Sequence, residues 1–189
     1  MDAKAEFIEI YKKHIKRDGA DKLLQWLESS DFFTCPASTK FHSNYAGGLV
    51  EHSVKVYHRL ERLVAMEKMS VSAESIAIIA LLHDVCKANT YKTEMRNVKR
   101  DGKWEEVPYY SVDDQLPYGH GEKSVYIISS FMKLTREEAL AINWHMGPYD
   151  ARNANNSYVL SDAFHKFPLT LIMFLADISS SYLDETIKK

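Results

Sequence analysis

The stretch Leu81-Leu82-His83-Asp84-Val85-Cys86-Lys87 decides how the chain folds and where its chemistry lies. It ends an apolar run in which Ile76, Ile79 and Ala80 keep the spacing of one helical face, and His83 continues that face. A histidine and an aspartate at the end of a buried face are costly to remove from water unless something pairs with them. A metal ion is the simplest partner, because imidazole and carboxylate are ordinary nitrogen and oxygen ligands.

The composition is that of one ordinary globular domain. The chain has 189 residues, 46% of them hydrophobic and 26% charged, and a formal net charge of −2. This charge argues against general nucleic-acid binding by phosphate neutralisation. Two cysteines, Cys35 and Cys86, make no disulfide framework and favour a reducing compartment. There is no signal-peptide core and no apolar run of the roughly 20 residues that a membrane span needs, so we expect a cytoplasmic protein.

Hydrophobic periodicity predicts helices over most of the chain. The expected ranges are about 3–15, a short helix capped by Asp21, about 48–68, 72–83, about 122–132, 136–145, about 159–165 and 167–186. Thr135 and Glu138 form a capping box for the helix that ends near His145. We find no internal repeat or linker, so the chain is not divided.

Between the helices, residues 91–99 and 104–111 are predicted to be strands. Asp101-Gly102 is the expected hairpin turn, and Pro108 makes the second strand an edge strand. The hairpin carries five cations that would suit an anionic substrate: Lys92, Arg96, Lys99, Arg100 and Lys103. Charges on a two-stranded ribbon are, however, usually solvated.

Two further polar residues lie on apolar helix faces. His52 shares the inward face of its helix with Leu49 and Val56. Asp177 follows Phe174 on a helix that is otherwise apolar, and a carboxylate there needs a cation or several hydrogen-bond donors. Spacing alone does not show that these residues meet His83 and Asp84 in space.

The order of these residues resembles that of the HD-domain metal-dependent phosphohydrolases. The stretch from Phe41 to His52 looks like the Gly-Gly-Leu-x-x-His opening of many members. Residues 81–87 are similar to the family's Leu-Leu-His-Asp-Ile-Gly-Lys, with Cys86 where glycine is usual. Asp177 takes the place of the late aspartate. The resemblance covers about residues 41–180.

The resemblance implies an all-α fold, an HD-domain helical bundle with a small inserted β-hairpin. We expect residues 1–189 to form a single HD domain with its metal-binding core at about 41–180. Residues 1–40 would be an N-terminal helical extension, and residues 90–112 would hold the inserted hairpin.

The resemblance also implies a metal site. The implied ligands are His52, His83, Asp84, His120, His145 and Asp177. Two divalent ions (Mn, Fe, Ni, Co, Zn or Mg) are expected, with Asp84 shared between them and His120 and His145 on the second. Those two histidines could instead contact the substrate or simply lie at helix ends.

Four residues are expected to contact the substrate: Lys87, Lys92, Arg96 and His42. Asp84 and Lys87 are the expected catalytic residues. Lys87 resembles the family lysine that contacts a substrate phosphate or orients the attacking water. His42 lies near the family's upstream histidine and either lines the pocket or lies on the surface.

The implied activity is hydrolysis of a phosphate ester or anhydride by metal-activated water. The expected partner is a small phosphorylated substrate such as a nucleotide. Three alternatives stay open: a 3′–5′ exonuclease, because the Gly-Gly-Leu-x-x-His opening is similar to one in exoribonucleases; a di-iron oxygenase with the same ligand order; and a non-catalytic nucleotide-binding module. Lys87 and the basic hairpin favour phosphate chemistry, and the full ligand set argues against a non-catalytic module.

Overall fold

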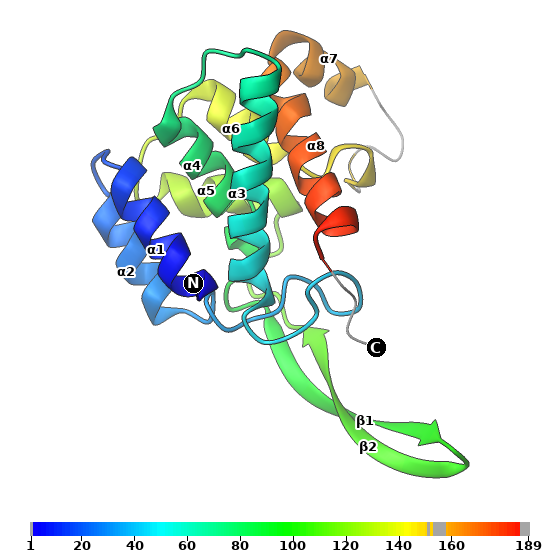
Figure 1. The fold of residues 1–189 in the computed structure, drawn as a ribbon. Helices are drawn as coiled ribbons and strands as arrows, with labels where there is room; N and C mark the ends of the chain where they lie inside the picture. The colour runs from blue at the N-terminus through cyan, green and yellow to red at the C-terminus, as the bar shows by residue number, and fades with distance from the viewer. Residues whose placement is uncertain (1, 151, 153–157, 186–189) are drawn as a thin grey trace.

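The computed structural model describes residues 2–150, 152 and 158–185. They form a helical bundle from which one hairpin projects (Figure 1). The helices are α1 (Ala3–His14), α2 (Ala20–Ser29), α3 (Gly48–Met66), α4 (Ala73–Leu82), α5 (His120–Ser129), α6 (Arg136–Asn143), α7 (Tyr158–Lys166) and α8 (Pro168–Leu183), and the strands are β1 (Tyr91–Arg100) and β2 (Lys103–Val112). The expected all-α bundle with a small hairpin is confirmed.

Helix α4 lies at the centre of the bundle because most of it has no polar face. Its residues from Ile76 to Leu82 are all buried, and α1, α3 and α6 pack against it. A helix that is apolar all round belongs in a protein interior. Since α4 ends at Leu82, His83 and Asp84 follow directly in the interior, where they are almost completely buried.

The Gly47-Gly48 pair lets the preceding loop lie against the start of α3. Gly47 has a φ of +79°, in the left-handed region that favours glycine. A Cβ on Gly48 would lie 2.0 Å from the carbonyl oxygen of Ser43, so a larger residue does not fit. This close approach places Ser43 against the start of α3, and His52 lies one turn further along the helix.

Helices α1 and α2 belong to the same hydrophobic core as α3 and α4. Phe7 and Tyr11 of α1 are completely or almost completely buried, and the Phe7 ring lies 5.3 Å from that of Phe32. The expectation that Asp21 caps the second helix is wrong. Gly19, at φ +87°, precedes the first helical residue, and its close approach to the backbone of Phe131 leaves no room for a Cβ.

Strands β1 and β2 pair antiparallel from Tyr91 opposite Val112 to Arg100 opposite Lys103. Asp101 and Gly102 have φ values of 49° and 82°, as a tight two-residue hairpin turn requires. The predicted hairpin is confirmed, with strands slightly longer than expected. It extends away from the helices, and most of its residues are exposed (Figure 1).

Helix α5 spans His120–Ser129 rather than the expected 122–132. The Glu122 carboxylate accepts a hydrogen bond from the backbone N–H of Gly119 at 3.2 Å, so Glu122 caps the helix from its third position. His120 is therefore the first residue of the helix.

Helix α8 packs against α3 and α6 and ends at Leu183. The helix was expected to continue to about residue 186, but the described residues 184 and 185 are not helical, so it ends earlier than predicted. Within the described part of the chain, no single helix is long and apolar enough to cross a membrane. Helices α7 and α8 meet that criterion only as a pair, which is bent by 108°.

Arg17 connects the segment after α1 to the starts of α4 and α6. Its guanidinium donates to both oxygens of Glu138, at 2.8 and 3.0 Å, and to Glu74 at 3.2 Å. Glu138 is 1% exposed and also accepts from the backbone of Thr135, which confirms the predicted capping box. Burial raises the pKa of Glu138, but the hydrogen bonds from Arg17 and Thr135 outweigh it and hold the pKa below its ordinary value.

We expect Arg17→Ala to lower the free energy of unfolding at pH 7 by about 2–4 kcal/mol, because a buried carboxylate loses its counter-charge. The pKa of Glu138 is lower in the folded chain than in the unfolded chain. Its ionised form therefore stabilises the wild type above about pH 4.3, and this stabilisation is lost as the pH falls further. The difference between variant and wild type should shrink between pH 7 and pH 3.5 in urea unfolding. Lys16→Ala, an exposed neighbour, is the control, and an equal difference at both pH values would contradict the assignment.

Candidate metal centre

The six residues expected to be ligands lie together, although separate segments carry them. Four of them are buried, whereas Asp177 and His120 are partly exposed. His52 is on α3, His83 and Asp84 directly follow α4, His120 begins α5, His145 follows α6 and Asp177 is on α8. Their meeting depends on the packing of α3 against α4 and α8, and of α6 against α5 and α8.

The carboxylate of Asp84 is the centre of this group. Its Oδ1 lies 2.7 Å from His120 Nε2 and 3.4 Å from His145 Nε2. Its Oδ2 lies 3.4 Å from His83 Nε2 and 3.6 Å from His52 Nε2. Each of the four imidazole rings therefore directs its Nε2 atom toward one buried carboxylate.

Backbone carbonyls fix the orientation of two of these rings. His83 Nδ1 donates to the carbonyl oxygen of Ala80 at 2.8 Å, and His145 Nδ1 donates to that of Ile142 at 2.7 Å. In a neutral ring the proton is then on Nδ1 and the lone pair on Nε2. His145 Nε2 is buried and has no hydrogen-bond partner among the described residues. A lone pair that faces a carboxylate is repelled by it unless a proton or a metal ion lies between the two.

His52 lies between two carboxylates. Its Nε2 is 3.2 Å from Asp177 Oδ1 and 3.1 Å from His83 Nε2, while its Nδ1 is 2.7 Å from Glu185 Oε1. Burial lowers the pKa of His52, but the hydrogen bonds to Asp177 and Glu185 outweigh it and raise the pKa to about 10. Burial likewise raises the pKa of Asp177, and the contact with His52 brings it well below its ordinary value. The surroundings of this ring thus favour positive charge.

The donor set fits divalent metal ions. Groups whose donor atoms lie within 4.8 Å of one another include His52, His83 and Asp84; His83, His145 and Asp177; and Asp84, Cys86 and His120. Imidazole nitrogen and carboxylate oxygen are ordinary ligands of the divalent first-row transition metals. These buried residues could therefore hold a metal ion.

Lys87 supplies a fixed positive charge beside the histidines. Its Nζ lies 2.6 Å from Asp84 Oδ2, and its side chain is 14% exposed. Burial lowers the pKa of Lys87, but the nearby charge of Asp84 outweighs it and raises the pKa above its ordinary value. Lys87 therefore stays charged and lines the opening to the centre together with His120 and Tyr91.

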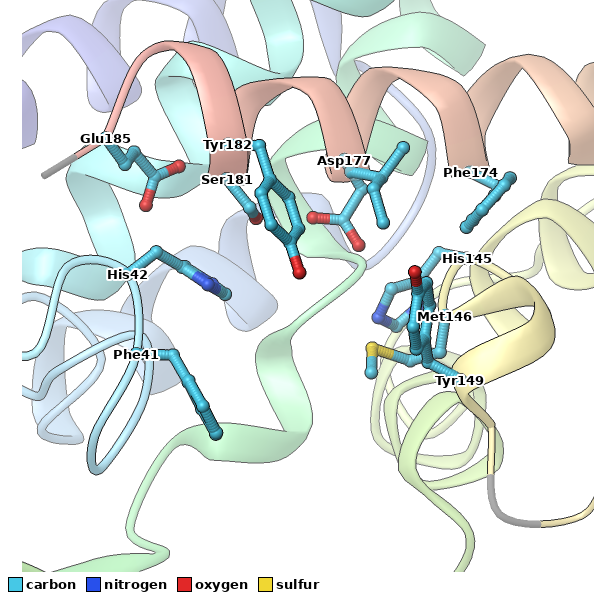
Figure 2. A pocket seen from close by; sticks show the side chains of 11 residues that line it. Phe41, His42, His145, Met146, Tyr149, Phe174, Asp177, Ser181, Tyr182 and Glu185 are labelled. Carbon is cyan, nitrogen blue, oxygen red and sulfur yellow. The ribbon is translucent and has the colours of Figure 1, made fainter. Parts of the chain in front are cut away.

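A cavity of about 430 Å³ reaches His145 and Asp177 from the protein surface. Four aromatic side chains line it: Phe41, Tyr149, Phe174 and Tyr182. Figure 2 shows His42 and Glu185 at one end of this cavity and His145 and Phe174 at the other, with Tyr182 between them. A smaller cavity of about 240 Å³ contains Asp84 and Lys87 and shares Phe41, His42, Met146 and Asp177 with the larger one. The two cavities lead to the same group of residues.

The four expected substrate-contact residues differ in their positions. Lys87 and His42 line the cavities. Burial and the nearby charge of His52 lower the pKa of His42 to about 4, so this ring is neutral at pH 7. Lys92 pairs with Asp113 and is 61% exposed, and Arg96 lies over the ring of Tyr109 on the hairpin. Lys92 and Arg96 are not among the residues that line either cavity.

Several residues of the site were not foreseen from the sequence. Glu185 is the main one, since an acidic residue near the end of the last predicted helix carries no signal of burial. For the aromatic residues that line the larger cavity, the only signal in the sequence is their nearness to the expected ligands.

Cys86 packs against the ring of His120. Its Sγ lies 3.5 Å from His120 Nδ1, and burial raises the pKa of the thiol to about 12. Cys86 therefore stays a neutral thiol that packs against the ring.

The family model of the HD domain matches residues 49–180, well over half of the chain. The chain belongs to the HD-domain family. HD domains bind divalent metals and are in general metal-dependent phosphohydrolases. Comparison with curated proteins and with solved structures gave no match.

Proposed function

We propose that this HD-domain protein is a metal-dependent phosphohydrolase that cleaves a phosphate ester or anhydride of a nucleotide or a related small phosphate compound. The observation that carries the proposal is the position of Lys87. Its charged amine contacts Asp84 and lines the cavity that reaches His120 and Asp177. A fixed cation beside a candidate metal centre suits a phosphoryl group.

The six clustered residues have distinct parts in this proposal. Two divalent ions held by them would lower the pKa of a bound water and neutralise charge that develops on the phosphoryl oxygens. His52 and His83 face Oδ2 of Asp84, whereas His120 and His145 face Oδ1. One carboxylate could therefore contribute a ligand oxygen to each of the two pairs of histidines. Lys87 would bind a phosphate oxygen or orient the attacking water.

The aromatic cavity supports a substrate with a planar ring. Phe41, Tyr149 and Tyr182 are 68%, 64% and 75% exposed, and all three line the larger cavity. A contiguous exposed patch of large apolar side chains typically marks a binding surface. Aromatic rings stack on every kind of nucleobase, because each base has a flat aromatic face. No Lys or Arg occurs in the described lining of this cavity, so it suits the uncharged part of a nucleotide.

We expect Tyr182→Ala to raise KM for a nucleotide substrate about tenfold and to leave kcat nearly unchanged, because a stacked ring contributes about 1–3 kcal/mol to binding. The residue is on the surface of α8, so the free energy of unfolding should not change. Tyr126→Ala is the matched control, an exposed tyrosine of α5 that does not line the cavity. Equal KM values for both variants would exclude stacking on Tyr182.

The proposal is tested by phosphate release from nucleoside mono-, di- and triphosphates with Mn²⁺ under anaerobic conditions. Release from one nucleotide class supports the hydrolase. A single-stranded oligonucleotide in the same panel tests the exonuclease alternative, which mononucleotide release from its end would favour. Oxygen uptake with Fe²⁺ and no phosphate release would favour the oxygenase. Nucleotide binding without either reaction would favour a non-catalytic module.

A further inference from the structure

Glu185 lies just beyond α8, and its buried carboxylate contacts Nδ1 of His52, one of the clustered histidines. Its side chain is 0% exposed. Oε1 accepts from His52 Nδ1 at 2.7 Å and from the Ser180 hydroxyl at 3.0 Å, while Oε2 accepts from the Ser43 hydroxyl at 2.5 Å. Donors from α3, from α8 and from the loop before α3 therefore hold this carboxylate.

The contact is made to the ring nitrogen of His52 that faces away from the other ligands. His52 Nε2 is directed at His83, Asp84 and Asp177, and Nδ1 is directed at Glu185. Because the carboxylate accepts from Nδ1–H, a metal ion that displaces the proton from Nε2 would meet the lone pair of that nitrogen. Backbone carbonyls do the same for His83 and His145, but His52 alone of these three has a charged acceptor.

We propose that Glu185 is a positioning residue that fixes the ring orientation and tautomer of His52 and strengthens it as a metal ligand. An anionic acceptor on Nδ1–H raises the basicity of the opposite nitrogen, and such partners typically change metal affinity 10- to 100-fold. Donors from His52, Ser43 and Ser180 hold this carboxylate in place against Nδ1 of the ring. The inference rests on the metal-binding part of the proposed function and not on the identity of the substrate.

The neighbouring acid, Asp184, provides a matched control. It pairs with Arg59 of α3, with Oδ1 2.5 Å from Nη2, and contacts none of the clustered histidines in the described structure. The Asp184–Arg59 pair is partly exposed, so it contributes little to stability. Asp184→Asn thus disturbs the same segment without touching His52.

The test measures Zn²⁺ and Mn²⁺ affinity of the full chain by competition with a chromophoric chelator. We expect Glu185→Ala to weaken binding 10- to 100-fold, Glu185→Gln to weaken it less, because the amide oxygen can still accept from Nδ1–H, and Asp184→Asn to leave it unchanged. ¹⁵N NMR of the Zn²⁺-loaded chain should show the Nδ1–H form of His52 in the wild type and in Glu185→Gln. Thermal unfolding identifies any variant that fails to fold, and Glu185→Gln then carries the test.

Two results would overturn the proposal. Wild-type metal affinity in folded Glu185→Ala or Glu185→Gln would show that the carboxylate does not act on His52. Loss of one whole metal equivalent in Glu185→Gln would make Glu185 a ligand rather than a positioning residue. Neither result depends on phosphate release, so a wild type that binds metal tightly but hydrolyses no nucleotide would contradict only the proposed activity.

Discussion

Asp84→Ala should release no phosphate above background and should retain much less metal than the wild type. Both pairs of histidines face Asp84, one pair through Oδ1 and the other through Oδ2. Its removal would withdraw a ligand from each set and would also leave Lys87 without its ion-pair partner. We expect the rate to fall roughly 10³-fold or more, measured as kcat for the best substrate.

The companion variant Asp84→Asn separates chemistry from folding. Asparagine keeps the size of the side chain and one oxygen but loses the negative charge that a cation requires. Circular dichroism and thermal unfolding should show a folded chain for this variant, with the loss of metal and activity persisting. Full activity in either variant would remove Asp84 from the site.

Lys87→Ala should keep its metal and lose turnover. The amine is proposed to contact a phosphate oxygen or the attacking water, so its removal should lower kcat about 10²-fold while the metal content stays at the wild-type level. Lys92→Ala is the matched control, because Lys92 is exposed on the hairpin and pairs with Asp113. We expect its kinetics to match those of the wild type. Loss of metal from Lys87→Ala would instead give this lysine a structural role.

The parts of the fold that follow from local patterns were predicted from the sequence. The apolar run of α4 places His83 and Asp84 in the interior, and Asp101-Gly102 predicts the hairpin because both turn positions need a positive φ. The capping box at Thr135 and Glu138 was also found. The helix boundaries were predicted less accurately than the helices themselves. Helix α5 begins two residues earlier than its apolar pattern indicates, because the Glu122 side chain caps the backbone at Gly119.

The candidate site was predictable only in part, because its residues meet through contacts distant in the sequence. Periodicity places His52 and Asp177 on inward faces, but only the resemblance to HD domains placed His120 and His145 in the same group. Glu185 was missed because neither apolar spacing nor a motif marks it, and its burial depends on donors from other segments. The resemblance also did not indicate the aromatic cavity, which side chains from loops and α8 form.

Metal content decides whether the buried histidines and aspartates form a metal centre. The purified chain, loaded with Mn²⁺ or Fe²⁺ and freed of excess ion, is measured by inductively coupled plasma mass spectrometry beside Asp84→Asn. We predict close to two metal equivalents per wild-type chain and a clear loss in the variant. Less than about one equivalent in the wild type, or equal content in both proteins, would contradict a two-metal centre.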